Sequence, residues 1–258
     1  MAVVKAQGLT KVYGSKKSAA TWALKDVSFE VQESEFLGVM GPSGSGKTTL
    51  LNLLASLDAP TSGKIEVCGI NPAVLQDEEM ALFRRRNIGF VFQDFNLLYT
   101  LSVKENIILP LALDNTPPDE IEKRVSEVAA QLGITKILDK RTFEVSQGEQ
   151  QRTAIARAII NRPGVVLADE PTGNLDSKAA NDVMKTFAGL NQNQGITVLM
   201  VTHDPFAASF CKRILFLKDG RIFSELRRGD GRQGFFQQII DALGVMGGTF
   251  DDTYPSYF

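Results

Sequence analysis

The chain has 258 residues, 43% of them hydrophobic and 22% charged, which is ordinary for a globular protein with a sizeable core. Its net charge of -2 supplies no basic field for nucleic acid or anionic lipid. The two cysteines, Cys68 and Cys211, lie far apart in no metal-binding spacing, which disfavours a disulfide scaffold or a zinc site and favours a reducing cytosol.

The first part of the chain predicts two kinds of strand. Residues 1–35 and 64–69 alternate apolar and polar residues in short pieces, which favours a small antiparallel sheet. Residues 36–40 are continuously apolar, as in a buried parallel strand, and are followed by a glycine-rich turn and a segment of helical periodicity. The longest apolar runs of the chain are far below the roughly 18 residues of a membrane helix, so we expect no membrane span.

The middle of the chain predicts helices. Residues 77–86 form a charged segment that ends in three arginines, which we interpret as a solvated helix end, and residues 87–93 follow as a buried strand. From 95 to about 160 the pattern is helical, with paired prolines in a surface loop at 114–120. We therefore expect a helical subdomain, inserted at about 95–160.

The last part predicts alternating strands and helices. Apolar runs at 165–170 and 196–203 precede helical segments near 177–190 and 205–212, and residues 213–223 predict a hairpin turning at Asp219 and Gly220. Alternation of this kind builds an α/β fold with a parallel sheet covered on both faces. We expect one domain over residues 1–228 and a helical tail over 229–258.

A phosphate-binding loop is the clearest chemical signal. Residues 41–48, GPSGSGKT, fit the pattern of Gly, four residues, then Gly-Lys-Ser/Thr, between a strand and a helix. Three glycines let the backbone curl around an anion, Lys47 reaches the β and γ phosphates, and the Thr48 hydroxyl can ligate Mg²⁺. The predicted nucleotide-binding residues here are Gly41, Pro42, Ser43, Gly44, Ser45, Gly46, Lys47, Thr48 and Thr49.

Polar side chains follow three strand-like runs. VVLADE at 165–170 ends in Asp169, which can hold Mg²⁺ through water, and Glu170, which can polarise an attacking water as general base. His203 is the only histidine in the chain and follows another strand, where it can hydrogen-bond the γ-phosphate. Gln93 can ligate Mg²⁺ or orient water. Taken alone, each of these four residues is more simply explained by a solvated or structural role. Because they accompany a phosphate loop, a role in binding or catalysis is favoured.

Two further features are weaker when taken alone. Tyr13 offers an aromatic face for a purine, and Trp22 is a rival that we rank second. SQGEQ at 146–150 predicts a helix start capped by Ser146 and Glu149. The same turn leaves backbone N–H groups and a positive helix end facing outward, which is typical of phosphate binding.

GPSGSGKT, Gln93, SQGEQ, VVLADE and His203, in this order and spacing, make the chain resemble the ATP-binding subunit of an ABC transporter over residues 3–225. The resemblance implies a P-loop NTPase (RecA-like) core with a small antiparallel β subdomain and the inserted helical subdomain. It implies ATP and Mg²⁺ as cofactors, with Thr48, Gln93 and Asp169 at the metal and Glu170 and His203 as catalytic residues.

The resemblance also gives the SQGEQ turn a role. In this family the turn is the signature motif, which binds the γ-phosphate of an ATP held by the other subunit of a head-to-tail homodimer. GNLDS at 173–177 is then the loop that carries Asp176 across the interface. The usual Leu-Ser-Gly-Gly-Gln is changed here to Val145, Ser146, Gln147, Gly148, Glu149, but the expected phosphate contacts, from Ser146 and Gly148, are retained. We therefore expect a working site.

Longer stretches, including FVFQDFNLLYTLSVKENIILPL and RQGFFQQIIDALGVMGG, resemble ATPases that work with FtsX-like permeases, and among them the bacitracin-type antimicrobial peptide resistance group. The resemblance implies an integral-membrane permease, a sensor histidine kinase reached through it, and a cytoplasmic location on the inner face of the membrane. The apolar residues at 95–101 are either core or a groove for a permease helix. The tail is expected to pack one stripe on the protein or its dimer mate: Phe235, Phe236, Ile239, Ile240 and Leu243.

Three alternatives stay open. Lipoprotein-release and cell-division ATPases with related permeases share the core motifs. A soluble ABC protein of translation or DNA repair usually carries two cassettes or a long inserted coil and a basic surface, which this sequence lacks. A nucleotide sensor that does not hydrolyse ATP is disfavoured by the presence of both Glu170 and His203.

Overall fold

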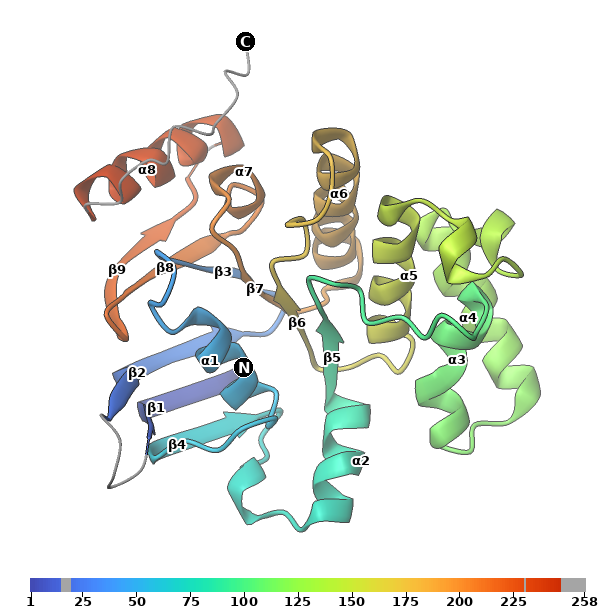
Figure 1. The fold of residues 1–258 in the computed structure, drawn as a ribbon, viewed down its shortest axis with the longest axis horizontal. Coiled ribbons are helices and arrows are strands. Elements are labelled where there is room, and N and C mark those ends of the chain that lie inside the picture. Colours follow the sequence, from blue (N-terminus) through green and yellow to red (C-terminus); the bar gives the residue numbers. More distant parts are fainter. Residues whose placement is uncertain (15–19, 230, 247–258) are drawn as a thin grey trace.

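The strands of the computed structural model, which describes residues 1–14, 20–229 and 231–246, form two sheets (Figure 1). The smaller sheet is antiparallel in the order β2-β1-β4, made of β1 (Ala2–Tyr13), β2 (Thr21–Gln32) and β4 (Ser62–Val67). β1 and β2 each run for 12 residues instead of the expected short pieces, because register shifts let the pair bend without breaking.

The larger sheet has the order β5-β6-β7-β3-β8-β9. Its first five strands are parallel: β5 (Ile88–Val91), β6 (Val165–Asp169), β7 (Val198–Val201), β3 (Phe36–Met40) and β8 (Arg213–Lys218). β9 (Arg221–Arg227) returns antiparallel after the predicted turn. Every residue of β3 and β7 is buried, as the continuous apolar runs predicted.

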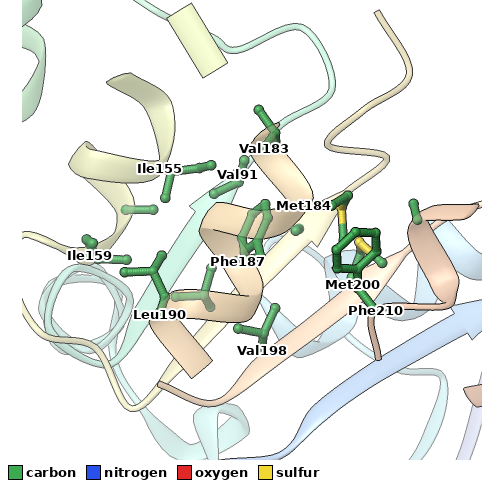
Figure 2. Packing of buried hydrophobic residues seen from close by; sticks show 14 of the residues in the cluster. Val91, Ile155, Ile159, Val183, Met184, Phe187, Leu190, Val198, Met200 and Phe210 are labelled. Carbon is green, nitrogen blue, oxygen red and sulfur yellow. The ribbon is translucent and has the colours of Figure 1, made fainter. Parts of the chain in front are cut away.

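Helices cover both faces of the larger sheet. α1 (Lys47–Leu54) lies between the two sheets, where Leu50 and Leu54 share a buried cluster with residues of both. On the other face, α6 (Ser177–Gln194) packs Phe187 and Leu190 against Val198 (Figure 2). Residues that follow β3, β6 and β7 are thereby held on a support of closely packed apolar side chains.

The helical part contains α2 (Asp77–Asn87), α3 (Val103–Leu113), α4 (Pro118–Leu132) and α5 (Gln147–Ile159). Single 3₁₀ turns span Pro72–Val74, Thr135–Ile137 and Thr142–Glu144. The arginines do end α2 and Arg86 is exposed, as the interpretation of a solvated helix end predicted, but they also make contacts that it did not include. Arg86 Nη2 lies 3.0 Å from Asp114 Oδ1, and Arg85 Nη1 donates to the Leu113 carbonyl at 2.7 Å, so they fasten α2 to the end of α3.

The C-terminal part contains two helices, α7 before β8 and α8 after β9. α7 (Pro205–Ala208) is shorter than predicted, because Lys212 N–H donates to the Phe36 carbonyl at 2.7 Å and draws the chain into β8. α8 (Arg232–Val245) buries Phe235 and Ile239, and Leu243 packs on the same cluster. Phe236 and Ile240, predicted in the same stripe, are only half-buried and lie outside that cluster, because they sit to one side of the line of contact. Part of the predicted tail, residues 247–258, lies outside the described residues.

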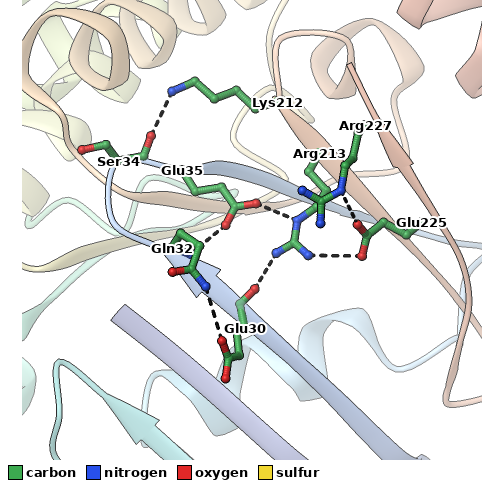
Figure 3. A network of polar contacts seen from close by, with 8 residues as sticks. All are labelled: Glu30, Gln32, Ser34, Glu35, Lys212, Arg213, Glu225 and Arg227. Carbon is green, nitrogen blue, oxygen red and sulfur yellow. Dashed lines mark hydrogen bonds and ion pairs between the residues drawn. The ribbon is translucent and has the colours of Figure 1, made fainter. Parts of the chain in front are cut away.

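An ion-pair network joins the N-terminal ends of β3 and β8 (Figure 3). Arg213, the first residue of β8, has its Nε 2.6 Å from Glu35 Oε1 and its Nη1 3.1 Å from Glu225 Oε2 on β9. The second Glu35 oxygen accepts the Gln32 N–H at 2.7 Å. Arg213 Nη2 also donates to the Glu30 carbonyl of β2. This single arginine therefore joins β2, β9 and the residue that precedes β3.

Candidate nucleotide site

The loop of residues 41–46 connects β3 to α1 and has little freedom to accept other residues. Gly46 has φ of 104°, and a Cβ there would collide with the Ala23 carbonyl of β2. A Cβ at Gly41 would collide with the Leu217 carbonyl of β8. α1 begins without a side-chain cap and without an acidic residue in its first turn, so its backbone N–H groups and positive end are free for an anion.

Lys47 is buried within this loop. Its Nζ donates to the carbonyls of Gly41 at 2.8 Å and Pro42 at 3.0 Å. Burial lowers the pKa of Lys47, while the charges of Glu170 and Asp169 oppose that shift. The ammonium group is therefore held by backbone dipoles rather than by a salt bridge, ready for a phosphate. Thr48 and Thr49 follow it in the same first turn, Thr48 exposed and Thr49 half-buried.

The carboxyl ends of β6 and β7 bring three titratable residues to one edge of the sheet. Asp169 pairs with Val201 across these strands, and the Glu170 N–H donates to the Val201 carbonyl at 2.9 Å. The His203 Nδ1 lies 2.9 Å from Glu170 Oε2. Glu170 has φ of 42°, a strained value of the kind that gathers at functional sites. The predicted meeting of Glu170 and His203 is found here.

The two neighbouring carboxylates have opposite electrostatics. Burial raises the pKa of Asp169, with a further rise from the charge of Glu170 and a partial offset from Lys47. The hydrogen bond from His203 lowers the pKa of Glu170, and the same bond raises the pKa of His203. A cation next to Asp169 would favour its charged form, which fits the metal role predicted for it.

Gln93 reaches the same edge from β5, the strand beside β6. A Cβ at Gly173 would lie 2.9 Å from Gln93 Nε2, so the side chain rests against the loop that follows Glu170. Asn174 Nδ2 donates to Asp94 Oδ1 at 2.8 Å and to the Gln93 carbonyl at 3.3 Å. These supports were not predicted from the sequence, although Gly173 and Asn174 both lie in the GNLDS stretch.

Tyr13 ends β1 with its side chain 41% exposed. Its hydroxyl donates to Asp58 Oδ2 at 2.8 Å, and Lys11 Nζ lies 4.8 Å from the ring centroid. Trp22 is 54% exposed and lines an open pocket with Lys25 and Arg221. The hydrogen bond fixes the Tyr13 ring, and no comparable bond of Trp22 is found among the described residues, which favours Tyr13 as the stacking residue.

The SQGEQ turn opens α5 as predicted. Ser146 is the N-cap, Glu149 completes the capping box, and the helix buries its apolar stripe. Gly148 is buried against Ala179 of α6, whose N-cap is Asp176. Gln151 Nε2 donates to the Pro171 carbonyl at 2.7 Å, next to Glu170. The SQGEQ turn, the Asp176 loop and the Glu170 loop are thus joined by direct contacts. In Figure 1, β5 and β6 lie between α5 and α1.

The residues predicted to hold Mg²⁺ supply a hydroxyl (Thr48), an amide carbonyl (Gln93) and a carboxylate (Asp169). An all-oxygen set of this kind suits Mg²⁺ rather than a transition metal. No helix in the described part of the chain has the length and apolar character needed to cross a bilayer.

Residues 24–173 match the ABC transporter family. The chain is 58% identical over 253 residues to YvcR of Bacillus subtilis, an uncharacterized ABC transporter ATP-binding protein, with 98% of each covered. It is 46% identical over 253 residues to the bacitracin export ATP-binding protein BceA of Halalkalibacterium halodurans, covering 98% of this chain and 100% of the relative.

A solved structure gives the same result. The ATP-binding cassette MJ0796 of Methanocaldococcus jannaschii, a dimer in a post-hydrolysis state bound to ADP and Pi, matches with a TM-score of 0.79 and 41% identity, covering 88% of this chain and 100% of that one. The predicted P-loop NTPase fold is confirmed. The chain belongs to the ABC transporter family, as an ATP-binding subunit with ATPase activity.

Proposed function

We propose that this ATPase powers an FtsX-like permease in resistance to antimicrobial peptides of the bacitracin type, and that it works as a homodimer. The observation that carries this proposal is the 46% identity to BceA over 253 residues, which is 98% of this chain. A sensor histidine kinase, reached through the permease, and a location on the inner face of the membrane belong to the same proposal.

The site residues take distinct roles in it. The 41–48 loop and Lys47 hold the phosphates of ATP. Lys47 is free to do so because, among the described residues, its ammonium group is bonded only to backbone carbonyls. Thr48, Gln93 and Asp169 hold Mg²⁺, which when bound offsets phosphate charge. Glu170 accepts a proton from the attacking water, since its lowered pKa keeps it ionised at neutral pH. His203 orients Glu170 and faces the γ-phosphate.

The homodimer would complete each site. Ser146 and Gly148 stand at the start of α5, and α5 lies beyond β5 and β6 from α1 of the same chain (Figure 1). A second copy would therefore supply them to the phosphates that Lys47 holds. Asp176, beside them at the start of α6, would cross the same interface. The dimeric state of the solved MJ0796 cassette supports this arrangement.

The permease would dock on an apolar surface near Gln93. Leu98, Tyr99 and Phe143 are 49%, 64% and 69% exposed, although each is large and apolar. Arg141 Nη1 donates to the Thr100 carbonyl at 2.6 Å and so holds the 98–100 loop beside the 3₁₀ turn that carries Phe143. Phe95 and Leu97, predicted in the same apolar set, are buried core residues.

The test replaces the chromosomal gene with a Glu170→Gln version and measures the minimal inhibitory concentration of bacitracin. We expect it to fall at least fourfold relative to the wild type, while Lys185→Ala, on the exposed face of α6, leaves it unchanged. An unchanged inhibitory concentration for Glu170→Gln would contradict the peptide-resistance role, and retention of lipoproteins in the inner membrane would point to lipoprotein release instead.

A further inference from the structure

The helices that would meet across one ATP differ in their first turns. α1 has no acidic residue there, whereas α5 carries Glu149. A helix N-terminus attracts an anion through its unpaired N–H groups and its dipole, and a carboxylate in the first turn occupies that same field. At α5 the chain therefore presents a charge of its own where a phosphate of the partner chain's ATP would arrive.

The capping box consumes the donors that the phosphate needs. Glu149 Oε2 accepts the Ser146 backbone N–H at 2.8 Å and also the Ser146 hydroxyl at 2.8 Å. The N–H of Ser146 is the main cause of the lowered pKa of Glu149, so the carboxylate is charged at neutral pH. The only hydrogen of the Ser146 hydroxyl thus points at Glu149 and not outward.

A second partner is available to this carboxylate. Arg152 lies one helical turn further along α5, and its Nη1 would be 3.7 Å from a Cβ at Gly148, which places the guanidinium over the first turn. Residues three apart on a helix are neighbours, so Glu149 can turn from Ser146 to Arg152 without moving the backbone.

We propose that Glu149 is a positioning residue that competes with the partner's ATP for the Ser146 hydroxyl, and so raises the ATP concentration needed to close the dimer. This inference rests on the proposed ATP-bridged homodimer. Closure turns the hydroxyl hydrogen from the carboxylate to the phosphate, and Glu149 then pairs with Arg152. Glutamine at 149 still completes a capping box but accepts a weaker, neutral hydrogen bond from the Ser146 hydroxyl.

The experiment titrates Mg-ATP against the dimer fraction of a Glu170→Gln parent by light scattering. Adding Glu149→Gln is expected to lower the half-maximal ATP concentration by roughly fivefold, given the difference between charged and neutral hydrogen bonds. The control is Glu105→Gln in the capping box of another helix, α3, where Glu105 Oε2 accepts the Ser102 N–H at 2.6 Å and lies 3.4 Å from Arg141 Nη1. Both changes should shift the melting temperature alike, and only Glu149→Gln should shift the ATP titration.

A third variant tests whether the competition runs through the hydroxyl. In a Glu170→Gln parent that also carries Ser146→Ala, adding Glu149→Gln should change the half-maximal ATP concentration by less than about twofold. A full fivefold effect there, or no effect of Glu149→Gln in the first parent, overturns the inference while leaving the dimer intact. A Glu170→Gln parent that stays monomeric at every ATP concentration overturns the ATP-bridged dimer itself, and the inference with it.

Discussion

Charged groups lie near both ends of strand β3, and the two sets are bound by different kinds of partner. At its N-terminal end Glu35 pairs with Arg213 at 2.6 Å, and Arg213 also pairs with Glu225 (Figure 3). At its C-terminal end the loop leads to Lys47, which in the described part of the chain donates only to backbone carbonyls. Asp169, which ends β6 at the same edge of the sheet, has a pKa raised by burial. The charges at the N-terminal end are paired with each other within the chain. Lys47 and Asp169 at the C-terminal end are the groups proposed to bind phosphate and Mg²⁺.

The difference separates residues that stabilise the fold from residues that serve the reaction. A buried arginine that pairs with a largely buried carboxylate is costly to remove, because that carboxylate loses its cation. A buried lysine held by carbonyls has its charged form disfavoured, so its removal should cost the fold little. Substitutions at the two ends should therefore affect different measurements.

Lys47→Ala should have the largest effect on activity. We expect ATP turnover to fall by at least about a hundredfold, the scale of losing one electrostatic contact to a reacting group. The urea midpoint of unfolding should stay the same or rise, because burial opposes the charge of Lys47. Lys185→Ala serves as the control for removal of an exposed lysine. A large drop in stability with Lys47→Ala would break the contrast between the two ends.

Arg213→Met should give the opposite pattern. Among the described residues, loss of the guanidinium leaves the largely buried Glu35 with only the Gln32 N–H, and Glu225 with only the exposed Arg227, at a cost of about 3 kcal/mol in the free energy of unfolding. Urea titration measures this cost, and Arg227→Met, at the exposed end of the same network, should cost far less. Turnover per folded molecule should stay near the wild-type value; a hundredfold loss would place Arg213 in the reaction.

The Glu170–His203 pair should contribute a small, pH-dependent stability. The pKa of His203 is raised above its ordinary 6.5, so its contribution is complete below about pH 6.5 and is lost as the pH rises through the raised value. The pKa of Glu170 is lowered from 4.5, so its contribution is complete above that pH and is lost as the pH falls.

His203→Gln should therefore destabilise the protein most between about pH 4.5 and 6.5, by less than about 1 kcal/mol, because solvent screens a side chain that is 61% exposed. Urea midpoints at pH 5.5 and 8.5 measure the difference. A penalty that is the same at both pH values would show that the pair is not charged in the way described.

Tyr13→Ala should have the smallest effect, a weakening of ATP binding by about 1 kcal/mol, as expected for a partly exposed aromatic contact. Tyr13→Phe keeps the ring but loses the bond to Asp58, and should bind ATP almost as well as the wild type. Calorimetric titration separates the two. Unchanged binding in Tyr13→Ala, together with weaker binding in Trp22→Ala, would transfer the stacking role to Trp22.

Local patterns predicted most of the site because its signals are contiguous in sequence. GPSGSGKT requires glycines where β2 and β8 approach the backbone, and the apolar runs before Asp169 and His203 carry both residues to one sheet edge. The capping box of Ser146 and Glu149 is likewise a short-range pattern. The alternation of strands and helices gave the parallel sheet for the same reason.

Long-range polar contacts could not be predicted in this way. Arg213 finds Glu35 at a separation of 178 residues, and Arg86 finds Asp114 across two helices. The end of α7 was also misplaced, because a hydrogen bond from Lys212 to the Phe36 carbonyl of another strand decides it. Such partners are brought together only in the folded chain, so the spacing of residues along the sequence does not predict them.

The most direct test of the account compares Glu170→Gln with Asp169→Asn by size-exclusion chromatography and light scattering in Mg-ATP. Glu170→Gln removes the base but keeps the shape of the side chain, so ATP should bind between the two copies without being cleaved and the protein should elute as an ATP-dependent dimer. Asp169→Asn should lose Mg²⁺ affinity and stay monomeric. A Glu170→Gln protein that hydrolyses ATP at the wild-type rate, or one that binds ATP uncleaved yet stays monomeric at high concentration, would contradict the account.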